Sequence, residues 1–345
     1  MKVDALSNEQ RVIAVQRLTA LWAFAESGLG GLLHALKLPF TGLMVGGMAV
    51  ILITFIAFFS KGNYKTILQS LLIVLIIKAA VSPHTPFPAY IAVSFQAVAG
   101  FILFSLLSVN FVSILFFGII AMVQSAVQKL LILTFFFGTS FWKAANELGN
   151  YIAKQFSLSS LEGSYWLVGI YFFIYLSGGV VISFTAFNMI KKFSFDSGAS
   201  VYSDQQPIQQ ESLPIRKKGT NKRLYFIFSF FVLLSIVLYI FTPKEEASLQ
   251  VLKTLIWTFT AIIVWYIILN PLLAKLIRNV LRQKRNVYTK QVDETLSFLP
   301  VIKHISATAW MRSKNSSGNR IKNFIFLLIN DTLMYNDSVP SLKKK

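Results

Sequence analysis

Long stretches without a charged residue alternate with short polar segments along most of the chain. The uncharged stretches run over residues 38–60, 79–128, 163–190, 224–243 and 254–274. A helix needs roughly 20 apolar residues to cross the hydrocarbon core of a membrane. The stretch over 79–128 is therefore long enough for two crossings, and we expect it to fold back at Pro83–Pro88, because three prolines in six residues do not continue a helix.

This pattern predicts an all-α, polytopic membrane protein with six helices, then two further transmembrane helices and a basic cytoplasmic tail. The expected helices lie near residues 12–38, 41–60, 65–82, 89–108, 111–138, 163–190, 223–242 and 250–276. A polar, partly basic segment separates the sixth helix from the seventh, which predicts four modules. These are a six-helix membrane module (1–192), a linker (193–222), a two-helix appendage (223–276) and the tail (277–345).

Composition supports the membrane assignment and adds an orientation. The 345 residues are 55% hydrophobic and carry a formal charge of +19, so the basic residues must lie outside the spans. Seven basic residues fall in 191–223 and thirteen follow residue 276, against four acidic ones there. Basic loops stay on the cytoplasmic side. The chain is therefore expected in the cell (inner) membrane, with both termini in the cytoplasm. The connection over 138–163 has balanced charge and is expected outside.

A stripe of small residues marks the first helix. Its members recur every four residues: Thr19, Ala23, Ser27, Gly31 and Ala35. Small residues at this spacing let two helix backbones approach closely in lipid. The small-residue stripe is therefore predicted to be a docking surface for another helix, in this chain or in a partner.

Polar side chains inside the spans of the first module are the candidates for a binding site. They are Glu26, His34, Gln96, Gln124, Gln128 and Lys129. Ionisable residues at membrane depth are costly and usually face protein or a watery cavity. All six are placed at mid-depth or in the outer half by the predicted topology, which favours a pocket open to the outside. The alternatives are that Glu26 pairs with a neighbouring lysine and that the glutamines hold helices together. Lys78, near a helix end, is expected to reach the membrane surface.

The tail contains a second kind of surface. Lys275, Arg278, Arg282 and Arg285 follow helical spacing beside Leu276, Ile277, Val280 and Leu281, which predicts a basic amphipathic segment lying on anionic membrane lipid. Another apolar stretch, Ile321 to Tyr335, is short for a span and is expected to be a surface helix or a docking helix for a cytosolic partner. Nucleic acid is not expected as a partner, because aromatic residues do not interleave with the basic ones.

Motifs of several enzyme classes are missing from the sequence. There is no G-x-x-x-x-G-K-[ST], so ATP hydrolysis by a P-loop mechanism must come from a separate protein. The three histidines lack metal-ligand spacing and there is no cysteine, so neither a metal nor another cofactor is expected. An enzyme that uses Glu26 or His34 as acid or base remains an open alternative.

Three segments resemble a known family. Leu21–Gly47, Lys78–Leu106 and Ser125–Gly138 are similar to the six-helix substrate-binding subunits of energy-coupling-factor transporters, a resemblance that covers about residues 12–192. It implies capture of a vitamin-like micronutrient from outside. It also implies docking, through small residues of the first helix, on a transmembrane coupling protein driven by two ABC-type ATPases. The family's alanine-x-x-x-alanine pair is replaced here by Ala23-x-x-x-Ser27. A noncatalytic scaffold of a multiprotein complex is the main alternative to uptake.

Overall fold

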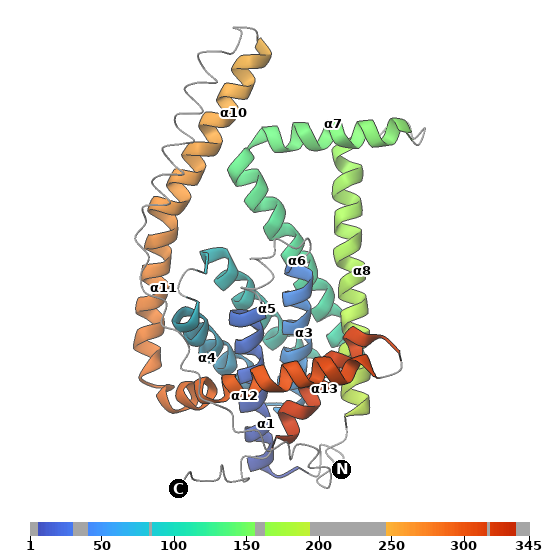
Figure 1. The fold of residues 1–345 in the computed structure, drawn as a ribbon, viewed down its shortest axis with the longest axis vertical. Coiled ribbons are helices and arrows are strands. Elements are labelled where there is room, and N and C mark those ends of the chain that lie inside the picture. The colour runs from blue at the N-terminus through green and yellow to red at the C-terminus, as the bar shows by residue number, and fades with distance from the viewer. Residues whose placement is uncertain are drawn as a thin grey trace. The chain divides into compact units, whose positions relative to one another are not determined.

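The computed structural model describes residues 6–29, 41–82, 85–155, 163–193, 246–315 and 318–335. This part of the chain is helical apart from short connections and contains no strand (Figure 1). The elements, in chain order, are α1 (Asn8–Phe24), η2 (Ala25–Leu29), α3 (Thr41–Phe59), α4 (Lys65–Val81), α5 (Phe87–Leu107), α6 (Phe111–Phe137), α7 (Thr139–Gln155), α8 (Gly163–Lys192), α10 (Glu246–Ile263), η3 (Val264–Leu269), α11 (Asn270–Arg285), α12 (Thr289–Lys314) and α13 (Arg320–Met334). Elements η2 and η3 are π-helical.

Four of these helices are long and apolar enough to cross a membrane: α3, α5, α6 and α8. They match the predicted helices at 41–60, 89–108, 111–138 and 163–190. Helix α4 matches the one predicted at 65–82 but has 17 residues, and the range 250–276 falls within α10, η3 and α11. The segment 223–242 lies outside the described residues. The described part of the chain is therefore helical with four membrane-length helices, and the total of eight crossings stays a prediction.

The helices form two compact units, and the predicted module boundaries stay a prediction. The first unit is Met1–Gln128, Phe172–Gln210 and Ala274–Lys345, and the second is Lys129–Tyr171 and Glu211–Leu273. The first contains α1, α3, α4, α5, α12 and α13, most of α6 and the later part of α8. Both ends of the chain thus belong to one unit, because the C-terminal helices pack on the first helix.

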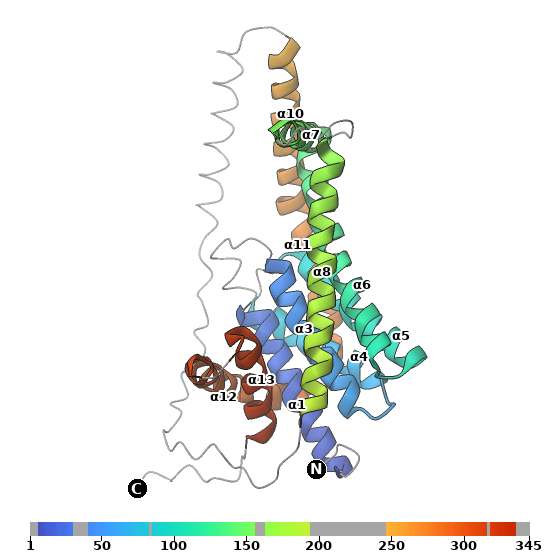
Figure 2. The same cartoon turned by 90° about the vertical axis from the view of Figure 1, so that its right-hand side faces the viewer.

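Helix α1 lies at the centre of the first unit. Its start is fixed by a capping box, in which Ser7 and Gln10 bond to each other's backbone N–H. Farther along, Leu18, Leu21 and Trp22 are fully buried. Helix α1 contacts α3 and α4 and also α12 and α13 (Figures 1 and 2). After Arg17 the sequence of α1 is apolar on almost every side. A helix of this kind is stable only when it is buried all round.

The two last helices, α12 and α13, both pack against α1. Asn319 caps α13 by accepting from the N–H groups of Ile321 and Lys322. Arg312 of α12 forms an ion pair with Asp331 of α13 at 2.7 Å, and Arg17 of α1 donates to the Leu333 carbonyl at 3.0 Å. The apolar stretch 321–335, expected to be a surface or docking helix, is therefore docked within its own chain.

In the second unit, the connection over 138–163 contains a helix, α7, that the sequence pattern did not predict. Helix α7 begins directly after Gly138, whose positive φ of 57° turns the chain at the end of α6. The unit is held together by Ser140 bonding to Thr254 at 2.6 Å and by the indole N–H of Trp257 donating to the Phe135 carbonyl. The balanced charges of the segment, such as Lys143 and Glu147, lie along an amphipathic helix.

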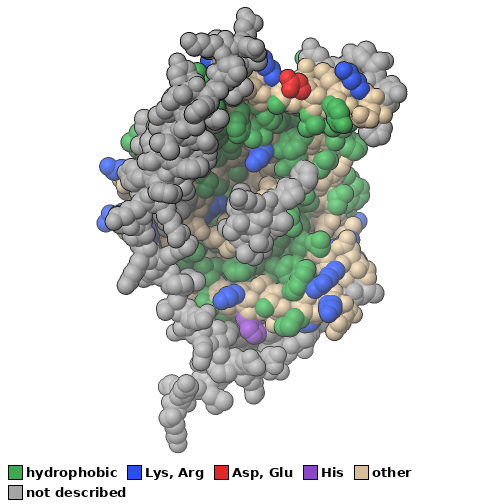
Figure 3. Space-filling model, turned by 45° about the horizontal axis from the view of Figure 1, so that its top comes forward, with side chains coloured by type: hydrophobic (Ala, Val, Ile, Leu, Met, Phe, Trp, Pro, Cys, Tyr) green, Lys and Arg blue, Asp and Glu red, His purple; other side chains and the backbone are tan. Residues whose placement is uncertain are grey.

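Large hydrophobic side chains remain on the surface of the long helices. Examples are Phe95 on α5, Phe116 on α6 and Phe173 on α8, exposed by 42%, 51% and 70%. Figure 3 shows hydrophobic side chains over much of one face, with Lys and Arg scattered among them. An exposed apolar surface of this extent is what a helix in contact with lipid presents.

Helices α6 and α8 cross at two glycines. A Cβ atom built on Gly179 would lie 2.9 Å from the Gly118 carbonyl oxygen and 3.0 Å from the Ile119 Cα. A Cβ atom on Gly118 would meet the side chain of Ser183, which itself donates to the Ile114 carbonyl at 3.0 Å. The obstacles are backbone atoms, so the helices would have to move apart to admit a side chain.

Gly179→Leu should therefore destabilise the first unit by about 1–3 kcal/mol through overpacking. We expect a lower thermal unfolding temperature in detergent. Gly169→Leu is the matched control on the same helix, because a Cβ atom there meets nothing within 4 Å. Equal unfolding temperatures for the two variants would contradict a close α6–α8 crossing.

Burial of Asp331 predicts a pH dependence of the α12–α13 contact. Desolvation raises the pKa of this carboxyl above 3.8 and outweighs the opposing effects of Arg312 and Asn330. A carboxyl with a raised pKa in the folded state favours folding most below its unfolded pKa, and this contribution is lost as the pH rises through its folded pKa. Asp331→Asn should remove the loss of thermal stability that occurs as the pH rises through the folded-state pKa of Asp331. An unchanged pH profile would contradict a raised pKa for this carboxyl.

Candidate functional site

Polar contacts follow the interface between α1 with η2 and α4, and we call this set the polar seam. Its members are Thr19, Glu26 and Ser27 on the first side and Ser70, Lys78 and Ser82 on the other. The hydroxyls of Thr19 and Ser70 bond at 2.8 Å, and the Ser82 hydroxyl donates to the Ser27 carbonyl at 3.2 Å. The seam fixes how α1 and α4 align, because each contact requires one register.

An ion pair between Lys78 and Glu26 forms the middle of the seam. Lys78 Nζ lies 2.6 Å from Glu26 Oε2, and the side chains of Lys78 and Glu26 are only 5% and 4% exposed. The expectation that Lys78 reaches the membrane surface is wrong, because a carboxylate within the bundle pairs with it. The alternative in which Glu26 pairs with a neighbouring lysine is confirmed.

Glu26 lies in the π-helical segment η2, where α1 departs from regular α-helix. Such segments are rare and occur frequently at functional sites. Next to the ion pair in sequence, the Ser27 hydroxyl and the Trp22 indole nitrogen are buried, and neither has a hydrogen-bond partner among the described residues. Buried polar atoms normally have a partner. Close to Glu26 in sequence there are thus two buried polar groups to which the described residues offer no partner.

The described part of the small-residue stripe is buried inside the chain. Thr19, Ala23 and Ser27 are exposed by 2%, 0% and 8%, on a helix that contacts α3 and α4. Gly31, Ala35 and the candidate His34 lie outside the described residues. The close helix packing predicted from the stripe occurs within this chain, and docking of a partner on it stays a prediction.

The predicted glutamines form a second group on other helices. Gln124 donates to Gln128 at 2.9 Å, and Gln128 donates to the Pro88 carbonyl at 2.7 Å, so α6 is bonded to the start of α5. Their four-residue spacing predicted this shared face. The Gln124 carbonyl oxygen is buried and has no partner among the described residues.

Gln96 belongs to the same group and packs where α3 comes close to α5 and α6. It is 3% exposed, and a Cβ atom built on Gly46 would lie 3.0 Å from its Nε2 and 3.5 Å from the Ser125 hydroxyl. Gly46 is thus the position on α3 that lets the amide and the hydroxyl fit against the backbone. The contact leaves little free volume around Gly46.

Lys129 is not part of either group. Its side chain is exposed, and the residue falls in the second compact unit. The lysine that pairs with Glu26 is Lys78. The predicted site residues did not include Ser70, Ser82 or Ser125. The four-residue spacing of Lys78 and Ser82 was the available signal for a shared face of α4.

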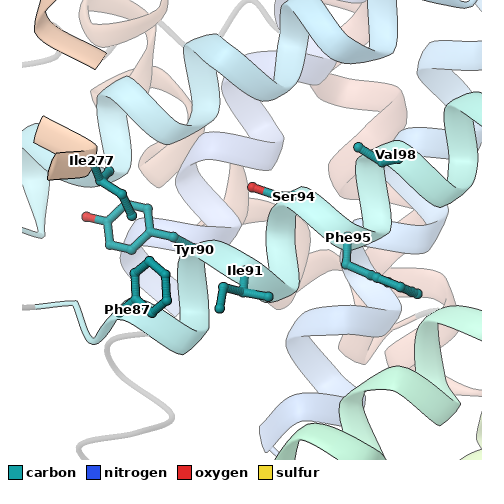
Figure 4. Close-up of a pocket in the computed structure, with 7 residues that line it drawn as sticks. All are labelled: Phe87, Tyr90, Ile91, Ser94, Phe95, Val98 and Ile277. Carbon is teal, nitrogen blue, oxygen red and sulfur yellow. The ribbon is translucent and has the colours of Figure 1, made fainter. Parts of the chain in front are cut away.

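An apolar groove of about 410 Å³ lies elsewhere in the first unit (Figure 4). Residues of α5, including Phe87, Tyr90 and Phe95, line it together with Ile277 of α11. None of the predicted binding residues lines this groove. Its lining provides almost no hydrogen-bonding groups, which suits an acyl chain better than a polar solute.

Metal chemistry has no support in the described parts of the chain, where no three His, Cys, Asp or Glu residues come together. Comparison with protein-family models, with curated proteins and with solved structures finds no match for the chain. The function must therefore be argued from the polar groups themselves.

Removal of one partner of the buried ion pair should be strongly destabilising. Glu26→Leu leaves the Lys78 charge unpaired in an apolar environment, and Lys78→Met does the same to Glu26, at a cost of about 3–5 kcal/mol each. The double variant Glu26→Leu/Lys78→Met should be more stable than either single variant, as read from thermal unfolding in detergent.

The control is Lys290→Met, which breaks the exposed Lys290–Glu294 pair at 4.0 Å. Exposed pairs contribute about 0–1 kcal/mol, so the unfolding temperature should barely change. Additive losses in the double variant would contradict direct coupling of Glu26 and Lys78.

Proposed function

We propose that this chain is an integral membrane protein that binds a small solute at the polar seam and serves as the solute-capturing component of an uptake system. The observation that carries the proposal is the buried Glu26–Lys78 pair, with the Ser27 hydroxyl and the Trp22 indole close by in sequence and without a partner among the described residues. Intramembrane ionisable residues mark solute and ion pathways more often than they add stability.

The chemistry of the pair indicates the class of solute. In the absence of a ligand the carboxylate and the ammonium neutralise each other. A zwitterionic solute replaces both partners at once, with its own carboxylate on Lys78 and its own ammonium on Glu26. Such an exchange leaves no charge unpaired. A purely anionic or purely cationic solute would leave the charge of Glu26 or of Lys78 without a partner.

Energy for uptake would come from a separate ATPase, since the sequence has no P-loop. The resemblance to energy-coupling-factor subunits supports this arrangement. The burial of Thr19, Ala23 and Ser27 shifts the contact with a coupling protein away from the described part of the stripe. The exposed apolar faces of α5 and α8 are the alternative surfaces in the first unit.

The proposal is tested by ligand-induced thermal stabilisation of the purified protein across a panel of zwitterionic, anionic and cationic micronutrients. A zwitterion should raise the unfolding temperature of the native chain and leave that of Glu26→Leu/Lys78→Met unchanged, because the double variant lacks both charges. Lys290→Met should respond like the native chain. Stabilisation of the double variant by the same compound would contradict binding at the pair.

A noncatalytic assembly component is the second candidate, and the mutual bonding of the predicted site residues favours it. Glu26 bonds to Lys78, and Gln124 to Gln128, so much of the polar core satisfies itself without a ligand. This function predicts a fixed partner that co-purifies with the chain, and no compound of the panel should stabilise it.

A further inference from the structure

Helix α11 has two unlike faces. Leu281 is 6% exposed and Ile277 lines the apolar groove next to α5, so this side faces the first unit (Figure 4). On another side, Leu272, Leu276 and Val280 are exposed by 56%, 60% and 57%. These three residues are four apart and form one continuous line along the helix, which we call the exposed strip.

The charged residues of α11 and of the short segment that follows it are all basic. Between Asn270 and Lys290 they are Lys275, Arg278, Arg282, Lys284, Arg285 and Lys290. At about 100° per residue, Lys275 and Arg282 lie roughly 100–120° from Leu276 on one side, and Lys284 lies about 80° away on the other. The side chains of these three flanking residues are exposed. The strip is thus bordered by cations on both sides.

We propose that α11 binds anionic lipid through this face, with the exposed strip among the acyl chains and Lys275, Arg282 and Lys284 on the head groups. Long basic side chains reach from an apolar surface to a polar boundary, so one helix satisfies both layers of a lipid leaflet. Nucleic acid would pair with the cations but leave Leu272, Leu276 and Val280 in water. Charge and exposed apolar area together therefore favour lipid.

The absence of cysteine from the chain allows a single reporter to be placed on the strip. Leu276→Cys, labelled with a small fluorophore, is reconstituted as the full chain in phosphatidylcholine vesicles. Quenching is compared between brominated phosphatidylglycerol and brominated phosphatidylcholine at equal content. Phe173→Cys on α8, which is 70% exposed in a segment without charges, is the control site.

At position 276 we expect phosphatidylglycerol to be preferred about fivefold over phosphatidylcholine, which corresponds to roughly 1 kcal/mol from one cation near a head group. The preference should disappear in Lys275→Gln/Arg282→Gln/Lys284→Gln and at position 173. It should persist in Lys61→Gln/Lys65→Gln/Lys143→Gln, which removes the same charge from other exposed sites.

Two results would overturn the proposal. Equal quenching by the two lipids, or none by either, would show that anionic lipid does not cover the strip. A fluorescence response to added duplex DNA without a preference for phosphatidylglycerol would assign the cations to nucleic acid. Failure of the solute-binding test leaves this inference intact, since none of its residues belongs to the polar seam.

Discussion

A carboxylate and an ammonium in an apolar helix bundle can be tolerated only together, and this constraint governs the first unit. With Lys78 and Glu26 2.6 Å apart, α1 and α4 are held in one register along the polar seam. Loss of either partner would leave a charge without water or counterion, which is among the most costly defects in a buried site. The contact therefore aligns the helices, and it is the pair of charges on which the proposed binding of a zwitterionic solute depends.

The same helix that carries Glu26 connects the membrane-length helices to the C-terminal pair. Arg17 bonds to the Leu333 carbonyl about two turns before Glu26, and both α12 and α13 contact α1. A change in the position of α1 would reach α13 through this contact. Solute binding at the seam and the position of the C-terminal helices are thus mechanically linked in the proposed function.

The positions of the long helices could be predicted from the sequence, whereas the pairing of side chains between helices could not. Uncharged runs predicted α3, α5, α6 and α8 to within a few residues, because membrane-length apolar helices leave a one-dimensional signal. For Glu26 the sequence left both a binding role and a pairing with a lysine open, because depth along a helix does not give the direction of a side chain around it, and that direction decides the contact with Lys78. Helix α7 was missed because a balanced mixture of Lys143 and Glu147 fits both an amphipathic helix and a polar loop.

The sequence by itself determined that the chain is helical and apolar, where its basic residues concentrate, and which few polar groups lie within its helices. These properties follow from local composition and spacing, which need no partner. Only the tertiary structure decided that Lys78 neutralises Glu26, that the described part of the small-residue stripe packs inside the chain, and that α13 docks on α1. Each of these joins residues more than 50 positions apart, or turns one helix face toward another, and helical periodicity alone does not encode such choices.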